Sequence, residues 1–424
     1  MTLLLLVIFC FGYLAISLEE PLKLNKAALG LFIAVILWTL LAVFSHAGHD
    51  IHQILSEHLA PIAEIIFFLM GAMTIVEVID RHQGFRLITD RIKTRHKRTL
   101  LIILGVVTFV LSSVLDNLAT TIVMIAIMSK FITDLRDKTL FTGIIVIAAN
   151  AGGAFSPIGD ITTTMLWIGG QISPLGILSH TILPSVVAFA VPLVVAFFLL
   201  KNDELQPTSS QTDSSVKTSH RVLIFSVGVG SLILVPFFKL ATGLPPFMGI
   251  LGALGIVWIL TELLHRKNHH TFSTRLSVTQ ALREIDLSSI LFFVGILLAV
   301  SALETGGVLK QLAQLLEASI SNKNLIPIYL GGISAVFDNV PLVAASMQMY
   351  PLAQVPMDNT FWLLLAYAAG TGGSMLIIGS AAGVTAMGMT KVSFGNYALR
   401  IAPLALIGYL AGITAFVLQS GLGQ

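Results

Sequence analysis

Two short stretches of this sequence place an Asp-Asn pair inside an apolar run: SSVLDN at residues 112–117 and SAVFDN at residues 334–339. The pairs Asp116-Asn117 and Asp338-Asn339 are 222 residues apart. A carboxylate at bilayer depth costs roughly 2.5–3.5 kcal/mol on insertion scales, so such residues are rare and usually functional. Two of them at matching positions in two chain halves indicate a paired ion site of the kind found in secondary transporters.

The composition predicts an all-α polytopic membrane protein. The 424 residues are 55% hydrophobic and 11% charged, with a mean hydropathy of +0.91, whereas soluble domains carry about 25% charged residues. The first apolar stretch lacks a basic segment and a small-residue cleavage site, which favours a spanning helix over a signal peptide. Cys10 is the single cysteine, which excludes an intramolecular disulfide and a thiolate metal cluster. We predict ten spanning helices, near residues 2–18, 27–44, 63–80, 141–170, 181–200, 221–238, 247–264, 287–305, 361–390 and 398–418.

Two more apolar pairs, 99–115 with 118–133 and 323–337 with 340–355, each bend at an Asp-Asn. We predict helical hairpins there, which either dip into the membrane and return or cross it twice. Both alternatives leave the other loops on the same sides. All Lys and Arg residues then lie on one side except Lys239, Lys310 and Lys323. The positive-inside rule makes the basic side cytoplasmic, so both termini are predicted to be periplasmic, in a bacterial inner membrane.

The two halves correspond in order. Gly152, Gly153 and Gly159 recur at an offset of 220, close to the offset of the Asp-Asn pairs. The predicted division is a first repeat at 1–200, a Ser/Thr-rich cytoplasmic linker at 201–220 and a second repeat at 221–424. Five crossings per half is an odd number, so the second repeat is inverted relative to the first, as in many secondary transporters. The alternative is chance similarity among apolar segments.

The hairpin tips carry oxygen ligands. At each tip one arm ends with free carbonyls and the next begins with free N–H groups. Carboxylate, amide and carbonyl oxygens are the ligands that hard cations prefer. Asp116 with Asn117, and Asp338 with Asn339, are therefore candidate cation ligands. The alternative is helix N-capping by the Asp, and both roles are compatible.

Two predicted spans are interrupted by Gly and Pro, over residues 150–164 and 370–380. Such breaks survive in a membrane only where they line a cavity or are buried in protein. Asp160 has Ser380 as its counterpart, so the first half is the more polar. Glycine used for close helix packing explains the glycines but not Asp160. The candidate ion-binding residues of the first break are Asn150, Ser156, Asp160, Thr162 and Thr163; Ser334 and Ser374 join the second-half site.

Other titratable groups lie near the span ends. Glu64, Asp80 and Glu304 are weaker candidates for proton access. His46, His49, Asp50, His52 and His58 form a cluster whose spacing suits metal binding or pH sensing. A solvated surface helix explains this cluster as well, and we assign no structural metal and no cofactor.

Several motifs resemble one family. LDNLATT (115–121), SPIGDITTTMLW (156–167) and DNVPL (338–342) are similar to the NhaD-type sodium/proton antiporters of bacteria, as are EIIFFLMGAMT (64–74) and GTGGS (370–374). The wider superfamily includes arsenite pumps and sodium-coupled dicarboxylate carriers. The resemblance implies re-entrant hairpins, broken helices, an elevator-like motion and a homodimer. It also implies functional roles at Glu64, Asp116, Asn117, Asn150, Asp160, Thr162, Thr163, Ser334, Asp338, Asn339 and Ser374.

These features lead to the hypothesis that internal Na+ or Li+ is exchanged for external H+. Burial disfavours a charged carboxylate, so Asp116 and Asp160 would hold a proton or a cation, but not both. Two acids would allow two protons per cation, hence electrogenic exchange. The expected partners are Na+, Li+, H+, the lipid bilayer and a second copy of the chain, with no nucleic acid.

Four alternatives remain. A channel is possible but fits the inverted, glycine-broken halves less well. A sodium-coupled organic anion symporter would typically show neutral Ser-Asn-Thr tips, whereas both tips here carry Asp. An arsenite carrier has a neutral substrate and is less excluded. An intramembrane aspartyl protease would also use two buried Asp residues, but its Tyr-Asp motif does not occur in this chain.

Overall fold

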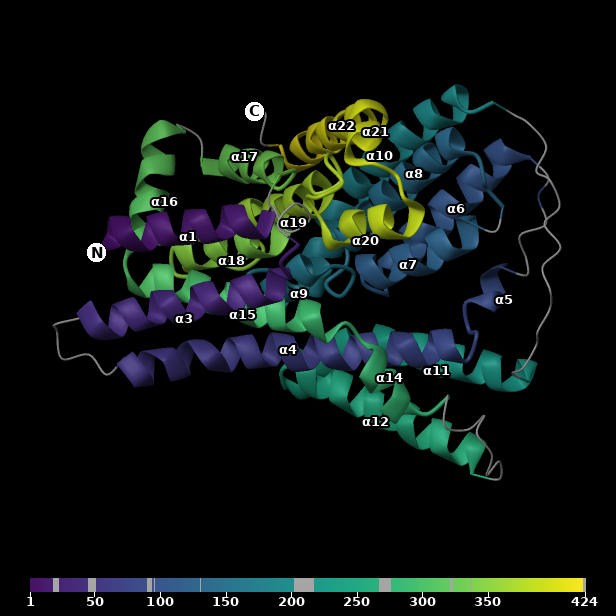
Figure 1. The fold of residues 1–424 in the computed structure, drawn as a ribbon, viewed down its shortest axis with the longest axis horizontal. Helices are drawn as coiled ribbons and strands as arrows, with labels where there is room; N and C mark the ends of the chain where they lie inside the picture. Colours follow the sequence, from purple (N-terminus) through teal and green to yellow (C-terminus); the bar gives the residue numbers. More distant parts are fainter. Residues whose placement is uncertain are drawn as a thin grey trace.

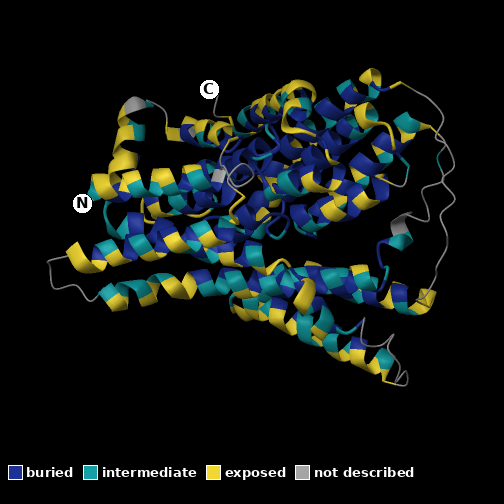
Figure 2. Cartoon of the chain, in the orientation of Figure 1, coloured by how far each residue is buried: buried dark blue, intermediate teal, exposed yellow. Residues whose placement is uncertain are grey.

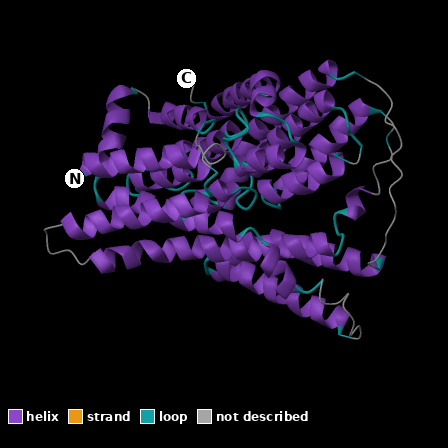
Figure 3. Ribbon diagram, in the orientation of Figure 1, coloured by secondary structure: helices purple, strands orange, loops and turns teal. Residues whose placement is uncertain are grey.

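A computed structural model describes residues 1–17, 23–44, 51–89, 94, 96–129, 131–201, 217–266, 276–320, 323–336 and 338–421. All regular elements in these ranges are helices (Figure 3), which confirms the all-α prediction. Most of the predicted linker lies outside the described residues. So do His46, His49 and Asp50, so the predicted histidine cluster is described only in part.

Seven of the described helices are long and apolar enough to cross a membrane, which confirms a multi-span protein. The apolar helix α1 (Thr2–Ser17) is shorter. The seven long helices are α3 (Lys26–Phe44), α4 (Ile51–Arg81), α10 (Pro174–Leu199), α11 (Thr218–Thr242), α12 (Pro246–His265), α15 (Leu287–Thr305) and α22 (Ala402–Ser420).

Two long helices begin earlier than the predicted spans near residues 63–80 and 181–200. Helix α10 starts at Pro174 because the Ser173 hydroxyl accepts the N–H of Gly176 at 2.9 Å, and proline suits the first helical turn. Helix α4 continues through Pro61 and includes His52 and His58. Hydropathy marks the membrane core, whereas helix ends follow capping and local hydrogen bonding.

The predicted hairpins and broken spans consist of shorter helices. The hairpin arms are α6 (Lys97–Ser112) with α7 (Asn117–Met128), and α17 (Ile326–Ile333) with α18 (Asn339–Met349). The predicted spans 141–170 and 361–390 are each two helices separated by a non-helical break: α8 (Leu135–Gly153) with α9 (Ile161–Ile168), and α19 (Thr360–Gly372) with α20 (Ala381–Thr390). The remaining elements are α5 (Arg86–Thr89), α14 (Val278–Glu284), α16 (Val308–Ser319), the 3-10 turn η1 (Lys323–Leu325) and α21 (Phe394–Arg400).

The described helices form two groups (Figure 1). The lower group in the view contains α3, α4, α11, α12 and α15. Helix α12 packs against both α4 and α11 along the lower edge of the view, and α15 packs against both α3 and α4. The hairpins and the broken helices lie together on the other side of α15. At the centre of that second group, α8 from Phe141 to Gly153 and α19 from Phe361 to Gly372 are buried at every residue (Figure 2). Both breaks therefore lie inside the protein.

Candidate ion-binding site

Both Asp residues at the hairpin tips are helix N-caps. A carboxylate oxygen of Asp116 accepts the N–H of Ala119 at 2.8 Å at the start of α7. Asp338 accepts the N–H of Val340 at 3.1 Å at the start of α18. The capping role predicted as an alternative is therefore confirmed at each tip. A carboxylate has further acceptor positions, so capping leaves both residues able to bind a proton or a cation.

Close backbone approach holds each hairpin against its break. A Cβ on Gly152 would fall within 3.0 Å of Phe109 in α6, and one on Gly372 would meet Gly331 in α17 in the same way. The Ser112 hydroxyl donates to the carbonyl of Ala149 at 2.6 Å, and the Ser334 hydroxyl donates to the carbonyl of Ala369 at 3.0 Å. Close packing thus explains these glycines, and it places Ser334 in a structural hydrogen bond.

Asn150 lies at the centre of a buried polar network. Its amide nitrogen donates to the hydroxyls of Ser374 at 2.9 Å and Ser380 at 3.0 Å, both from the second half of the chain. Its amide oxygen accepts from the side-chain nitrogen of Asn117 at 2.9 Å. All four side chains are buried. The first hairpin tip, the first broken span and the second break are joined here.

Asp160 is held by groups from both halves. One carboxylate oxygen accepts from the Thr162 hydroxyl at 3.0 Å and from the amide nitrogen of Asn339 at 3.2 Å. The Thr163 hydroxyl donates to the Asp160 carbonyl at 2.9 Å. The structure therefore brings the first break and the second hairpin tip together, and it does so at a buried carboxylate.

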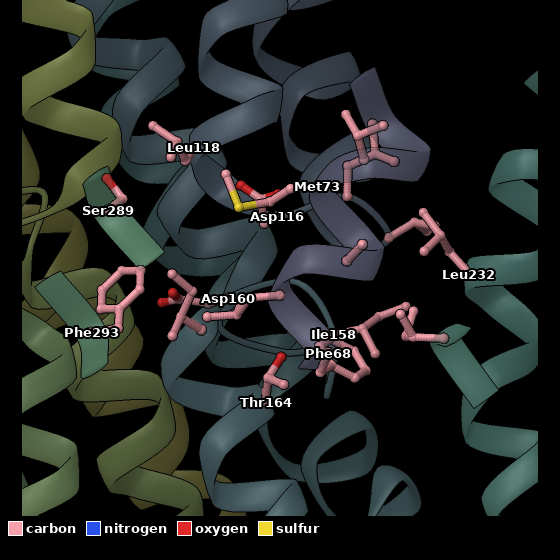
Figure 4. A pocket seen from close by; sticks show the side chains of 17 residues that line it. Phe68, Met73, Asp116, Leu118, Ile158, Asp160, Thr164, Leu232, Ser289 and Phe293 are labelled. Atoms are coloured by element: carbon pink, nitrogen blue, oxygen red, sulfur yellow. The ribbon is translucent and has the colours of Figure 1, made fainter. Parts of the chain in front are cut away.

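Asp116 and Asp160 line one cavity between the two groups of helices (Figure 4). Phe68 and Met73 of α4, Leu232 of α11 and Phe293 of α15 are among the other lining residues, so the rest of the cavity wall is almost entirely apolar. Among the lining residues only the two Asp side chains carry a formal charge. Apolar surroundings disfavour the ionisation of both carboxyl groups at once unless a cation is bound.

The remaining candidates lie elsewhere. Glu64 does not line the cavity, and Asp80 is exposed at the end of α4. Glu304 pairs with His58 at 3.7 Å. Their proposed role in proton access stays a prediction. Ser156 is buried within the first break, where its hydroxyl accepts the N–H of Ile158 at 3.4 Å.

Sequence reasoning did not count two further residues as site residues. Ser380 binds Asn150, and Thr164 lines the cavity while donating to the carbonyl of Pro157 at 3.1 Å. The sequence feature that could have identified Ser380 as a site residue is its correspondence with Asp160 in the repeat. Thr164 follows two threonines that were selected and has no distinguishing signal in the sequence.

The fold, with the buried Asp160 and the half-buried Asp116 on one cavity, defines an α-helical membrane transporter, and comparison with known proteins gives its family. The citrate transporter family CitMHS matches residues 5–364. Sodium/proton antiporter 1 of Arabidopsis thaliana is 49% identical over 412 residues, covering 97% of this chain and 71% of that protein. Sodium/proton antiporter 2 of the same plant is 44% identical over 418 residues, covering 97% and 98%. The Na(+)/H(+) antiporter NhaD of Vibrio cholerae is 30% identical over 450 residues, covering 97% and 91%.

The chain therefore belongs to the CitMHS family and, within it, to the group of NhaD-type sodium/proton antiporters. The predicted resemblance is confirmed. These relatives are transporters and not enzymes, so the protease alternative is discarded. They come from a plant as well as from bacteria, and the predicted bacterial inner membrane stays a prediction.

Proposed function

We propose that the protein exchanges cytoplasmic Na+ or Li+ for external H+ by competition at Asp116 and Asp160. The observation that carries this proposal is the shared cavity, where these two are the charged lining groups. A proton or an alkali cation can compensate their charge, whereas an anion would be repelled. The names of the relatives support the same exchange.

The proposed architecture is a pair of inverted repeats, with residues 1–200 and 221–424 joined by a linker. Packing supports it, because contacts recur in equivalent pairs. Helix α6 packs on α8 as α17 packs on α19, and α3 packs on α15 as α12 packs on α4. We assign the re-entrant hairpins and broken helices to the part that moves in an elevator-like step, and the lower group of helices to a fixed scaffold. A homodimer with both termini on the outer side completes the proposal.

The competition gives a simple rule for coupling. If the moving part crosses only when its carboxylates are neutralised, a proton or a cation must be bound on each crossing. A ligand shifts the inward–outward equilibrium only through differential binding to the two states. Two carboxylates in one cavity are consistent with two protons per cation and hence with net charge movement.

The test is dissipation of a pH gradient in everted vesicles from antiporter-deficient cells. Addition of Na+ or Li+ should dissipate the gradient with the wild type and not with Asp116→Asn. Asp134→Asn is the matched control, because Asp134 makes the same type of N-cap on the exposed start of α8. Loss of the response in Asp134→Asn as well, or its retention in Asp116→Asn, would contradict the proposed role.

A second candidate function is sodium-coupled uptake of an organic anion, which the name of the matching family favours. Uptake of labelled citrate or succinate by the same vesicles, together with no response of the pH gradient to any alkali cation, would support this candidate instead.

A further inference from the structure

The two halves of the site differ at two matched positions. At the common offset of 220, Asn150 corresponds to Gly370 and Asp160 corresponds to Ser380. The first half therefore has a side-chain amide and a carboxylate where the second half has a bare backbone position and a hydroxyl. Both differences lie within the buried network.

The side chain of Asn150 points into the second half-site. Its two N–H donors are used on the hydroxyl oxygens of Ser374 and Ser380, at 2.9 and 3.0 Å. Those hydroxyl oxygens are the groups that would ligate a cation bound beside the second break. The amide nitrogen of Asn150 donates to both oxygens at once, so it takes the place between them that a cation would need.

Gly370 brings no side-chain amide to the equivalent place in the first half-site, where Asp160 accepts one side-chain amide hydrogen bond, from Asn339. The counterparts of Ser374 and Ser380 are Ala154 and Asp160. A Cβ built on Gly370 would lie 3.0 Å from the Ala154 Cβ and 3.5 Å from a carboxylate oxygen of Asp160. A side chain at position 370 would thus point at Asp160 in the way that Asn150 points at Ser380.

We propose that Asn150 fills the second half-site and that Gly370 leaves the first one without an equivalent amide, so that each chain binds one alkali cation, at Asp160. This inference rests on the proposed function and extends it, because it names the residues that set the number of bound cations. The cation is thus held in the first half-site only, although the two halves of the chain otherwise correspond.

The experiment measures Na+ bound per chain by isothermal titration calorimetry on the purified full-length protein in detergent. The wild type should bind one Na+ per chain. Ser380→Asp alone should still bind one, because Asn150 continues to fill the space. Asn150→Gly combined with Ser380→Asp copies the glycine and the carboxylate of the first half-site and should raise the number to two.

A third variant tests the first half-site. Gly370→Asn directs an amide at Asp160 and should lower Na+ affinity at least tenfold, whereas Gly370→Ala adds only the Cβ and should have a smaller effect. Size-exclusion profiles and melting temperatures identify any variant that fails to fold. If the double variant fails to fold, the number of Na+ bound per wild-type chain and the comparison of Gly370→Asn with Gly370→Ala still test the proposal.

Three results would overturn the inference: two Na+ per chain in the wild type, two in Ser380→Asp alone, or wild-type affinity in Gly370→Asn. Failure of the proposed function gives a different result. In that case the wild type would show neither Na+ binding nor a response of the pH gradient to Na+ or Li+.

Discussion

Replacing Gly152 with alanine should displace the first hairpin from its break. Gly152 faces the backbone of Phe109 in α6, and a Cβ there would lie 2.9 Å from the Phe109 carbonyl carbon and closer still to its oxygen. Carbon atoms in contact prefer about 3.5–4.0 Å, so α6 and α8 would have to separate by roughly 1 Å. The obstacle is backbone rather than a flexible side chain, so a rotamer change cannot relieve it.

The expected loss follows from that displacement. Overpacking of a well-packed core costs about 1–3 kcal/mol. The hairpin carries Asp116, and a misplacement of about 1 Å at a functional group can reduce a rate on the order of 100-fold. We therefore expect Gly152→Ala to fold with a lowered melting temperature and to lose most cation-dependent dissipation of the pH gradient.

The matched control is Gly252→Ala. Gly252 lies on the exposed surface of α12, where a Cβ meets nothing within 4 Å. Alanine favours a helix over glycine by about 1 kcal/mol, so this variant should be as stable as the wild type or more so. Both variants are compared by thermal unfolding in detergent and by the vesicle assay. If Gly152→Ala matches Gly252→Ala in both measurements, the argument from backbone contact is wrong.

Three further predictions concern individual side chains. Asp160→Asn should abolish the response to Na+ and keep the fold, since an amide oxygen still accepts from Asn339; vesicle assays and melting temperatures test both parts. Ser173→Ala removes a hydroxyl that donates to the Asp358 carboxylate at 2.7 Å and should cost about 1.5–3 kcal/mol in thermal unfolding. Burial lowers the pKa of His82, the first residue after α4, from 6.5 to about 4, so the unfolded state binds more protons and stability falls as pH drops through that window. Between pH 7 and pH 5 the wild type should lose about 2 kcal/mol that His82→Gln does not lose.

The sequence was sufficient to predict the elements that carry the site. Apolar runs interrupted by Asp-Asn predicted the hairpin tips, and Gly-rich interruptions predicted the breaks, because these are strong local signals in a membrane protein. Asp116 and Asp160 were selected for the same reason and lie on one cavity. The ends of α4 and α10 were less predictable, since hydropathy carries no information about a helix that extends beyond the apolar core.

Partners across the two halves could not be predicted from the sequence. The offset of 220 relates Asn150 to Gly370, but the amide contacts Ser380, the counterpart of Asp160. Likewise, Glu304 was grouped with the proton-access acids of the first half, and the structure pairs it with His58. An internal repeat shows which residues are equivalent, whereas contact depends on how the two repeats are turned toward each other.

The contact between Asp160 and Asn339 shows how the charge on one carboxylate can reach the opposite hairpin. The Asn339 amide donates to the Asp160 carboxylate at 3.2 Å, and Asn339 follows the capping residue Asp338 at the second tip. A hydrogen bond to an ionised group is roughly twice as strong as one between neutral groups. Under the proposed exchange, protonation of Asp160 would therefore weaken the link between the first break and the second hairpin, and a bound cation would compete with the Asn339 amide for the same oxygen. Both ligands would then act on one contact between the halves, which is the physical condition for proton and cation binding to bias the same conformational equilibrium.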